Sequence, residues 1–257
     1  MEMFCLIKKS IFSCKCLKKK GTKTVSISYT SSLRFFFCCL LTLLPVAVQA
    51  AGGLSVQGTR IIYPQDSKQV SISLTNSSAT DSFLVQSWIE DASGEKSDAF
   101  VVTPPLYLSG PRNENIVRIM YVSSPLPTDR ETLFWFVAKS IPSIDKSKLQ
   151  GRNMLLLTLA SRIKLFVRPA GLTSDRNTAP SALLFRQVGN QIEISNPTPY
   201  YLTLSDIQFN GKNTEGVMVS PLGHSTLPFS GKKGTTITFR TIDDFGSLSP
   251  QLNTIVQ

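Results

Sequence analysis

The stretch RNMLLLTLASRIKLFVRP, residues 152–169, constrains the fold more strongly than any other feature of the chain. Nothing between Asn153 and Arg168 interrupts its β-pattern, and at ~3.3 Å per residue a strand of this length would span about 50 Å. Ordinary strands have about five or six residues. Because side chains alternate between the faces of a strand, one face here is almost wholly apolar, whereas the other becomes cationic at Arg162, Lys164 and Arg168. A sandwich domain of ordinary size cannot cover both faces of such a strand.

Three uses of this stretch are distinguishable from the residues. It can be an internal strand of the protein's own core, which is where most apolar runs lie. A transmembrane role is excluded, because three cations interrupt fewer than 18 apolar residues. Alternatively, its first half is offered to another protein by strand addition. In that case Leu155, Leu157 and Leu159 would each contribute about 1.5–3 kcal/mol when fully buried in the partner.

The distribution of charge indicates an N-terminal signal peptide. The whole chain carries +10, but residues 1–50 hold eight Lys and Arg and one acid, which leaves +3 for the other 207 residues. A nucleic-acid partner is therefore not indicated. A basic leader is followed by the apolar run FFFCCLLTLLPVAV (35–48) and by VQA (48–50). This order predicts a secretory signal peptide, residues 1–50, cleaved near Ala50. Fourteen apolar residues are too few for a comfortable membrane span, although an uncleaved anchor remains the alternative.

The residues that usually carry catalysis or bind metals are scarce after residue 50. All the cysteines lie before the predicted cleavage point, so disulfides and thiol chemistry are excluded from the mature chain. His224 is the only histidine, and no Gly-rich phosphate loop is present. The adjacent carboxylates Asp243 and Asp244 point to opposite faces if they lie on a strand, which argues against a shared metal site. We therefore predict no enzymatic activity, no cofactor and no metal.

Short strand patterns separated by turns dominate the mature chain. KQVSISLTNSS (68–78) alternates apolar and polar residues with period two, and SFLVQSWIED, NIVRIMYV and TLFWFVAKSIP continue the series up to Pro142. After Pro169 and Gly171 a second series begins, with turns at Gly-Asn and at Asn-Pro-Thr-Pro. These patterns predict an all-β protein with two β-sandwich domains, residues 51–168 and 169–257. Trp88 is expected in the first core.

Five segments together carry a family resemblance. They are GTRIIY (58–63), LPTDRETLFWFVAKSIP (126–142), RIKLFVRPA (162–170), NPTPYYLTL (196–204) and IDDFG (242–246). With them the chain resembles the PapD-like family of periplasmic pilus chaperones of the chaperone–usher pathway. The resemblance implies two immunoglobulin-like domains at a fixed angle, in the shape of a boomerang. It also implies residence in the periplasm of a Gram-negative bacterium.

The resemblance further implies partners and mechanism. Such a chaperone binds and folds pilin subunits by donor-strand complementation, in which its long strand fills a groove of the incomplete subunit. It then delivers the subunit to the outer-membrane usher, and when free it can cap itself as a homodimer. A secreted β-sandwich adhesin or ligand-binding protein is the alternative that the residues alone leave open.

Individual roles follow from the resemblance at matching positions. It implies that Arg60 and Lys164 hold the C-terminal carboxylate of the pilin. It implies that the groove-filling side chains are Leu155, Leu157 and Leu159, and that Glu131, Arg168 and Asp244 form an interdomain salt bridge. Val137 departs from the family pattern, which usually has Asn there.

Overall fold

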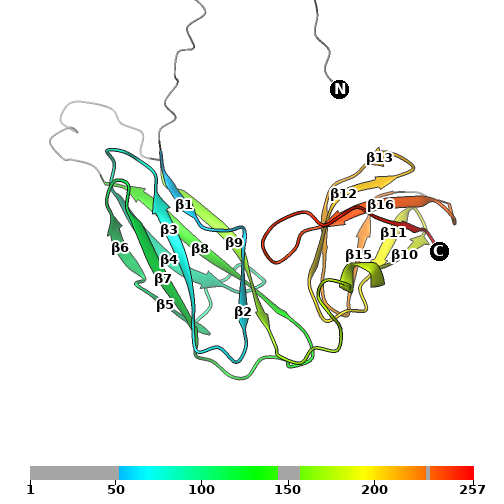
Figure 1. Ribbon diagram of the computed structural model, residues 1–257, viewed down its shortest axis with the longest axis horizontal. Coiled ribbons are helices and arrows are strands. Elements are labelled where there is room, and N and C mark those ends of the chain that lie inside the picture. The colour runs from blue at the N-terminus through cyan, green and yellow to red at the C-terminus, as the bar shows by residue number, and fades with distance from the viewer. Residues whose placement is uncertain (1–51, 144–156, 230–231) are drawn as a thin grey trace, which may run out of the picture. The chain divides into compact units, whose positions relative to one another are not determined.

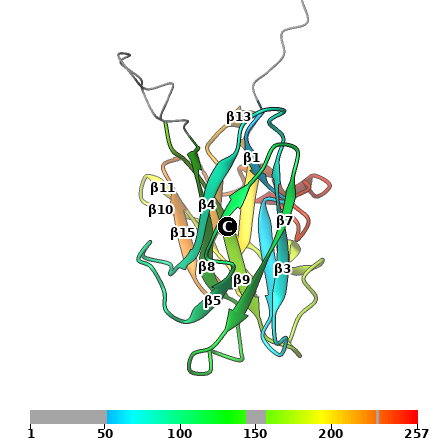
Figure 2. The same cartoon turned by 90° about the vertical axis from the view of Figure 1, so that its left-hand side faces the viewer.

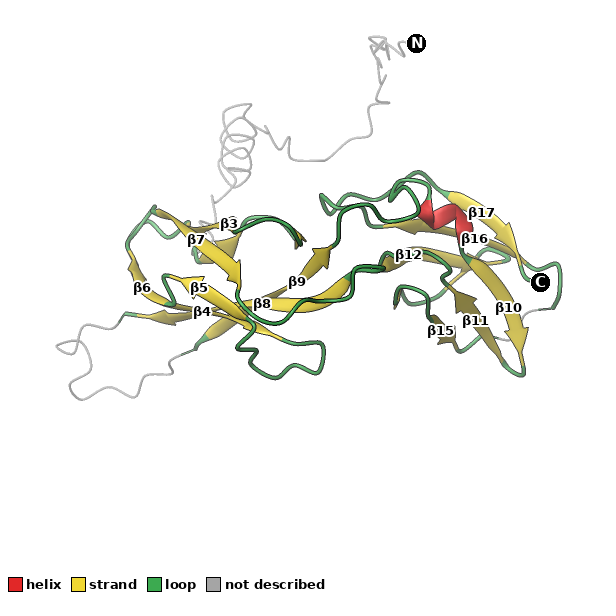
Figure 3. Ribbon diagram, turned by 90° about the horizontal axis from the view of Figure 1, so that it is seen from below, coloured by secondary structure: helices red, strands yellow, loops and turns green. Residues whose placement is uncertain are grey.

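The computed structural model describes residues 52–143, 157–229 and 232–257. Within these ranges the regular structure is almost entirely β, as Figure 3 shows by colour, and the helical exception is one 3₁₀ turn, Ala179–Ala182 (η2). The strands form four sheets that enclose two separate hydrophobic cores. The prediction of an all-β chain with two sandwiches is confirmed.

The N-terminal sandwich consists of two facing sheets (Figures 1 and 2). The first has the order β1 (Leu54–Val56), β3 (Val70–Asn76), β7 (Glu114–Tyr121), β5 (Phe100–Thr103). The second has the order β2 (Arg60–Pro64), β9 (Leu159–Arg168), β8 (Thr132–Pro142), β4 (Phe83–Glu90), β6 (Leu106–Ser109). On β3 and β4, period-two alternation places every second side chain in the core between the sheets.

Aromatic side chains fill much of this first core. Phe100 packs edge to face against Tyr63, Tyr121 and Phe134, with ring centroids 5.9, 5.0 and 4.9 Å apart. The buried hydroxyl of Tyr63 is satisfied, because it donates to the carbonyl of Ser67 at 3.0 Å and accepts the N–H of Tyr121 at 3.1 Å. The strand bearing Tyr63 is thereby fixed against the opposite sheet.

The expectation that Trp88 lies in the core is wrong. On β4 the inward positions belong to Val85, Ser87 and Ile89, so the parity of the strand turns Trp88 to the outer face of the sheet. There Trp88 is partly exposed, and its indole N–H donates to Glu90 Oε1 at 3.1 Å. The alternation of residues indicates a strand here, but by itself it does not show which face of the strand lies in the core.

The C-terminal sandwich encloses the second core. One sheet has the order β10 (Leu184–Val188), β11 (Gln191–Ser195), β15 (His224–Leu227). The other has the order β13 (Lys212–Asn213), β12 (Leu202–Phe209), β16 (Thr236–Thr241), β17 (Leu252–Ile255), and β14 (Val217–Val219) also pairs with β12. Ile192, Leu202 and Phe209 are fully buried between the two sheets.

The long strand is shorter than the sequence predicts. β9 begins at Leu159, and the two described residues before it, Leu157 and Thr158, lie outside any strand. Residues 153–156 of the predicted strand lie outside the described residues. In the observed register Ser140 of β8 lies opposite Leu159, so Leu157 would meet Pro142. Proline has no N–H to donate, which explains why the ladder ends there.

No helix in the described parts of the chain is long and apolar enough to cross a membrane. Nor do these residues contain a group of three His, Cys, Asp or Glu side chains that could hold a metal ion.

Candidate functional site

The main chain of β9 is only partly covered on one side. On its inner side β8 pairs with β9 from Leu159 to Val167. On its outer side β2 is parallel to β9 and pairs only with Lys164 to Arg168 (Figure 1). Within the described residues, the stretch 159–163 therefore has no neighbour on the outer side. It is an open sheet edge, which can accept a strand from another chain.

The main-chain groups of successive residues along this edge point in alternate directions. Gln65 N donates to the carbonyl of Arg168 at 2.8 Å, so the main-chain groups of Arg168 face β2. The main-chain groups of successive residues in a strand face opposite sides. Those of Ala160 and Arg162 therefore face the open edge, whereas those of Leu159 and Ser161 face β8. The edge thus presents two N–H groups and two carbonyls to a partner.

The apolar row of β9 changes its surroundings along the strand. Leu165 and Val167 lie in the first core and are at most 1% exposed. Leu159 on the same row is 71% exposed, and Leu157 just before the strand is 64% exposed. Leu155, the third predicted groove-filling residue, lies outside the described residues. One row of side chains thus contributes to the protein's own core at one end and lies in solvent at the other.

Arg60 and Lys164 lie opposite each other at the point where the open edge meets β2. Arg60 Nη1 donates to the carbonyl of Ile242 at 3.2 Å, and Lys164 Nζ donates to Thr203 Oγ1 at 3.3 Å. Arg60 Nε is buried without a hydrogen-bond partner. Neither cation belongs to an ion pair within the described residues.

The electrostatics of this pair favour an anion. Burial lowers the pKa of Lys164, and the nearby charge of Arg60 lowers it further. Burial also lowers the pKa of Arg60, and the charge of Arg176 adds to this effect, whereas the nearby carboxylates of Asp244, Asp243 and Glu131 oppose it. Two partly buried like charges are held side by side at a cost, which a carboxylate between them would offset. The place is therefore suited to bind a carboxylate.

Arg168, at the end of β9, joins the two sandwiches by ion pairs. Its Nε donates to Glu131 Oε1 at 2.7 Å, and its two Nη atoms donate to the Asp244 carboxylate at 2.6 and 2.8 Å. The second oxygen of Glu131 accepts the N–H of Tyr201 at 2.8 Å. The structure therefore brings together the three predicted members of this network, which spans both domains.

The members of the network are buried to different degrees. The side chain of Glu131 is only 1% exposed, and this burial raises its pKa, partly offset by the charge of Arg168. Burial opposes ionisation of Asp244 as well, but its bonds to Arg168 outweigh this effect and lower its pKa. Burial likewise disfavours the cation of Arg168, yet its bonds to Asp244 and Glu131 raise its pKa. The carboxylates and the guanidinium of the network are therefore well supplied with hydrogen-bond partners.

The sequence did not single out Arg176 as a member of this site. Its Nε lies 3.5 Å from Asp244 Oδ1, and its Nη2 donates at 3.1 Å to the carbonyl of Ile242, which also accepts from Arg60. No recognised motif includes Arg176, so the pattern held no signal for it. Tyr201 was present in a recognised motif, and its ring lies 5.4 Å from that of Phe166 on β9.

A buried asparagine shapes the loop that carries Tyr201. Asn196 Nδ2 donates to the carbonyls of Tyr200 and Ser220 at 2.8 and 3.0 Å. Its Oδ1 accepts from the N–H and the hydroxyl of Thr198 at 3.0 and 2.7 Å. The loop is thus fixed from within, and it holds the N–H of Tyr201 against Glu131.

Replacing Asp244 by alanine should lower the free energy of unfolding by about 1–3 kcal/mol, the scale of a charged hydrogen bond lost with its partner left partly buried. Equilibrium urea unfolding measures this change. Asp129→Ala is the matched control, because Asp129 pairs with Arg130 at 2.7 Å but is 57% exposed, and exposed pairs contribute little. Equal effects of the two substitutions would show that the Arg168 network is only a surface feature.

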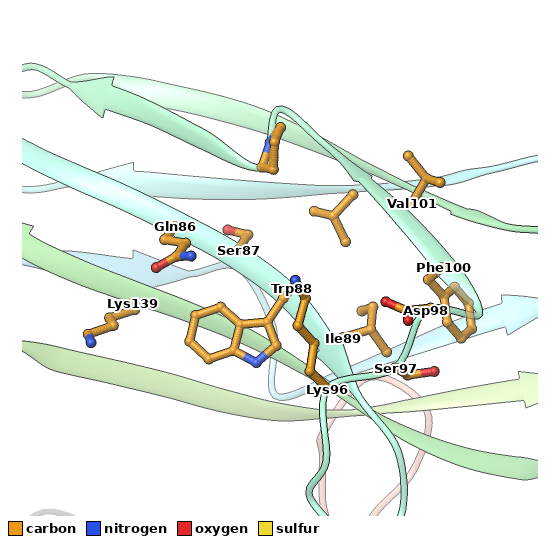
Figure 4. A pocket seen from close by; sticks show the side chains of 12 residues that line it. Gln86, Ser87, Trp88, Ile89, Lys96, Ser97, Asp98, Phe100, Val101 and Lys139 are labelled. Carbon is orange, nitrogen blue, oxygen red and sulfur yellow. The ribbon is translucent and has the colours of Figure 1, made fainter.

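The outer face of the larger sheet carries a separate set of contacts. Arg162 lies over the Trp135 ring, 3.9 Å from its centroid, and its Nε donates to Glu90 at 2.8 Å. Next to this set, Figure 4 shows a hollow in which the indole of Trp88 lies between the side chains of Lys139 and Lys96. Arg162 differs from Lys164, because Arg162 pairs with Glu90 and Lys164 has no ion-pair partner among the described residues.

Comparisons with known proteins agree on one family. Residues 53–173 match "Pili and flagellar-assembly chaperone, PapD N-terminal domain", and residues 178–252 match "Pili assembly chaperone PapD, C-terminal domain". The chain is 44% identical over 209 residues to "Probable fimbrial chaperone SfmC" of Escherichia coli strain K12, which covers 81% of this chain and 90% of that protein. It is 40% identical over 238 residues to "Chaperone protein FimC" of the same strain, covering 90% and 98%.

Solved structures show the same similarity. The crystal structure of the periplasmic chaperone SfaE has a TM-score of 0.70 and 40% identity, and the match covers 78% of this chain and 98% of that one. The structure of Salmonella enterica SafA pilin in complex with the SafB chaperone has a TM-score of 0.72 and 29% identity, covering 81% and 98%. Both support the prediction of immunoglobulin-like domains.

Proposed function

The chain belongs to the PapD-like family of pilus chaperones and acts on pilin subunits, and from this premise we propose that it lends the open edge of β9 to the subunit while Arg60 and Lys164 bind the subunit's C-terminal carboxylate. The family is periplasmic, and its role is not enzymatic. The relatives do not favour the alternative of an adhesin.

One observation carries this proposal: the open edge of residues 159–163 runs directly into Arg60 and Lys164, which form no ion pair among the described residues. Strand addition supplies main-chain hydrogen bonds, and alternate side chains supply specificity. The main-chain groups of Ala160 and Arg162 would bond to the subunit. The exposed side chains of Leu157 and Leu159, with Leu155 before them, would enter its groove.

The carboxylate anchor also sets the register of the added strand. A slip of one residue would turn every side chain to the opposite face. A terminal carboxylate fixed at Arg60 and Lys164 allows only one alignment of the subunit against β9. The cations therefore determine which subunit residues lie opposite Leu159.

Further steps of the pathway belong to the same proposal. The signal peptide is cleaved near Ala50, and the mature chaperone acts in the Gram-negative periplasm. It delivers the completed subunit to the outer-membrane usher. Before a subunit arrives, two copies cap each other through their exposed edges, because an open apolar edge would otherwise aggregate with other exposed strands.

Co-expression with a pilin encoded beside its gene tests the proposal through Leu159. Wild-type protein should recover the pilin as a soluble complex from periplasmic extract. Leu159→Ala should raise the dissociation constant about tenfold, since much of the contribution of a buried leucine, about 1.5–3 kcal/mol, is lost. The affinity is measured by titration with purified components.

Ile255→Ala is the control for this substitution. Ile255 is 58% exposed and lies on β17 of the C-terminal sandwich, away from β9. The control should bind the pilin like wild type. If Leu159→Ala also binds like wild type, the open edge is not the binding element.

A further inference from the structure

Phe245 is the most exposed of the large apolar side chains that the structure describes, at 90%. A single exposed apolar residue is common on protein surfaces and requires no explanation by itself. The position and the rigidity of Phe245 are what distinguish it, because its neighbours in sequence are all engaged in contacts.

The turn that carries Phe245 is held tightly from within. Asp243 Oδ1 accepts the N–H groups of Phe245 and Ser247 at 2.9 and 2.8 Å. The N–H of Asp243 donates to the carbonyl of Ser247 at 2.9 Å, and that of Gly246 donates to the carbonyl of Asp243 at 3.2 Å. Gly246 has φ of +89°, a value that suits glycine. The Phe245 side chain is therefore presented on a fixed backbone.

Residues before and after Phe245 in this turn contact the N-terminal sandwich, close to Arg60 and Lys164. Before it, the carbonyl of Ile242 accepts from Arg60, and Asp244 pairs with Arg168. After it, Gly246 lies so close to Thr59 that a Cβ on it would be 2.3 Å from Thr59 Oγ1. Phe245 therefore projects from a turn whose residues contact Thr59, just before β2, and Arg168, at the end of β9.

We propose that Phe245 forms a second anchor for the subunit, packing against an apolar side chain among the last few residues before its C-terminal carboxylate. The inference rests on the proposed function, because the carboxylate held by Arg60 and Lys164 brings those residues next to the turn. In an extended chain each residue advances ~3.3 Å, so the side chains nearest the carboxylate are within reach of a phenyl ring.

The chemistry of the ring suits this occupant. An aromatic side chain supplies a large contact area for the loss of only two torsional freedoms, and a fixed backbone lowers the entropic cost further. The cations recognise any chain terminus, since every subunit ends in a carboxylate. Phe245 thus adds selection for subunits whose C-terminal end is apolar.

The test measures how fast purified chaperone–pilin complexes dissociate, using labelled pilin and an excess of unlabelled wild-type chaperone as trap. Phe245→Ala should raise the dissociation rate about tenfold, whereas Phe245→Leu should raise it less. The control Ile255→Ala should leave the rate unchanged. A second pilin, with its last two side chains replaced by alanine and its carboxylate intact, should show no more than about a twofold effect of Phe245→Ala.

The outcomes separate this inference from the proposed function. If Phe245→Ala leaves the rate unchanged, or acts equally on both pilins, the second anchor is wrong, and Lys164→Ala still reports on the carboxylate site. If Phe245→Ala changes pilus assembly in cells but not dissociation of the complex, the ring serves another partner and the inference also fails. Loss of both the Lys164 and the Phe245 effects would overturn the proposed function itself.

Discussion

Lys164→Ala is expected to weaken the chaperone–pilin complex by at least about 30-fold, while the protein itself stays folded. Removing one partner of a buried, hydrogen-bonded charge pair costs about 2–5 kcal/mol, because the other charge is left unpaired. In the free protein Lys164 makes no ion pair within the described residues and its pKa is lowered by burial, so its loss removes only the 3.3 Å hydrogen bond to Thr203 Oγ1. The measurements are recovery of the pilin from periplasmic extract and titration of the purified components.

Lys212→Ala is the matched control, because Lys212 is exposed on β13 of the other sandwich. It should recover the pilin like wild type. Arg60→Ala should have an effect of the same order as Lys164→Ala. The double substitution should cost less than the sum, because both cations act on one carboxylate. Recovery of the pilin at wild-type levels by Lys164→Ala would rule out the carboxylate anchor.

Ala160→Pro is expected to abolish complex formation altogether. The N–H of Ala160 faces the open edge, so proline removes a donor that the subunit would use and places a ring in the path of its backbone. The bonds between β9 and β8 remain, since they involve Leu159 and Ser161. Urea unfolding should therefore give a nearly unchanged midpoint, and co-expression should yield no soluble pilin.

Ser161→Pro, one residue further along, provides the opposite control. Ser161 lies opposite Ala138 and its N–H faces β8, so proline there should destabilise the sheet itself. The two neighbouring substitutions thus separate loss of binding from loss of folding. A soluble complex formed by Ala160→Pro would show that the subunit does not pair with this edge.

Much of the fold could be predicted because period-two alternation is a property of the sequence alone. The strand that carries Ile72 and Leu74 follows it, and those side chains are buried. Which face of a strand is buried depends on its tertiary neighbours. For that reason the expectation that Trp88 lies in the core was wrong. The early end of β9 depends on Pro142 of a neighbouring strand, which no local pattern along residues 153–158 reveals.

The site was predictable only in part for a similar reason. Arg162, Lys164 and Arg168 form one alternating row in the sequence, yet each has different surroundings. Arg162 pairs with Glu90, Arg168 pairs with two acids of different domains, and Lys164 faces no acid among the described residues. Those differences arise from β4, β8 and the second sandwich, which the row itself does not encode.

The incomplete coverage of β9 by β2 also imposes a polarity on whatever joins it. A chain that terminates at Arg60 and Lys164 and extends back along residues 163 to 159 must travel in the same direction as β9. It therefore lies in line with β2, with its C-terminus facing the first residue of β2. Arg60 at that position blocks any further extension of the subunit chain. A subunit carrying even a short extension beyond its natural last residue would collide with β2. Binding in this mode would therefore depend on the position of the subunit's C-terminal residue.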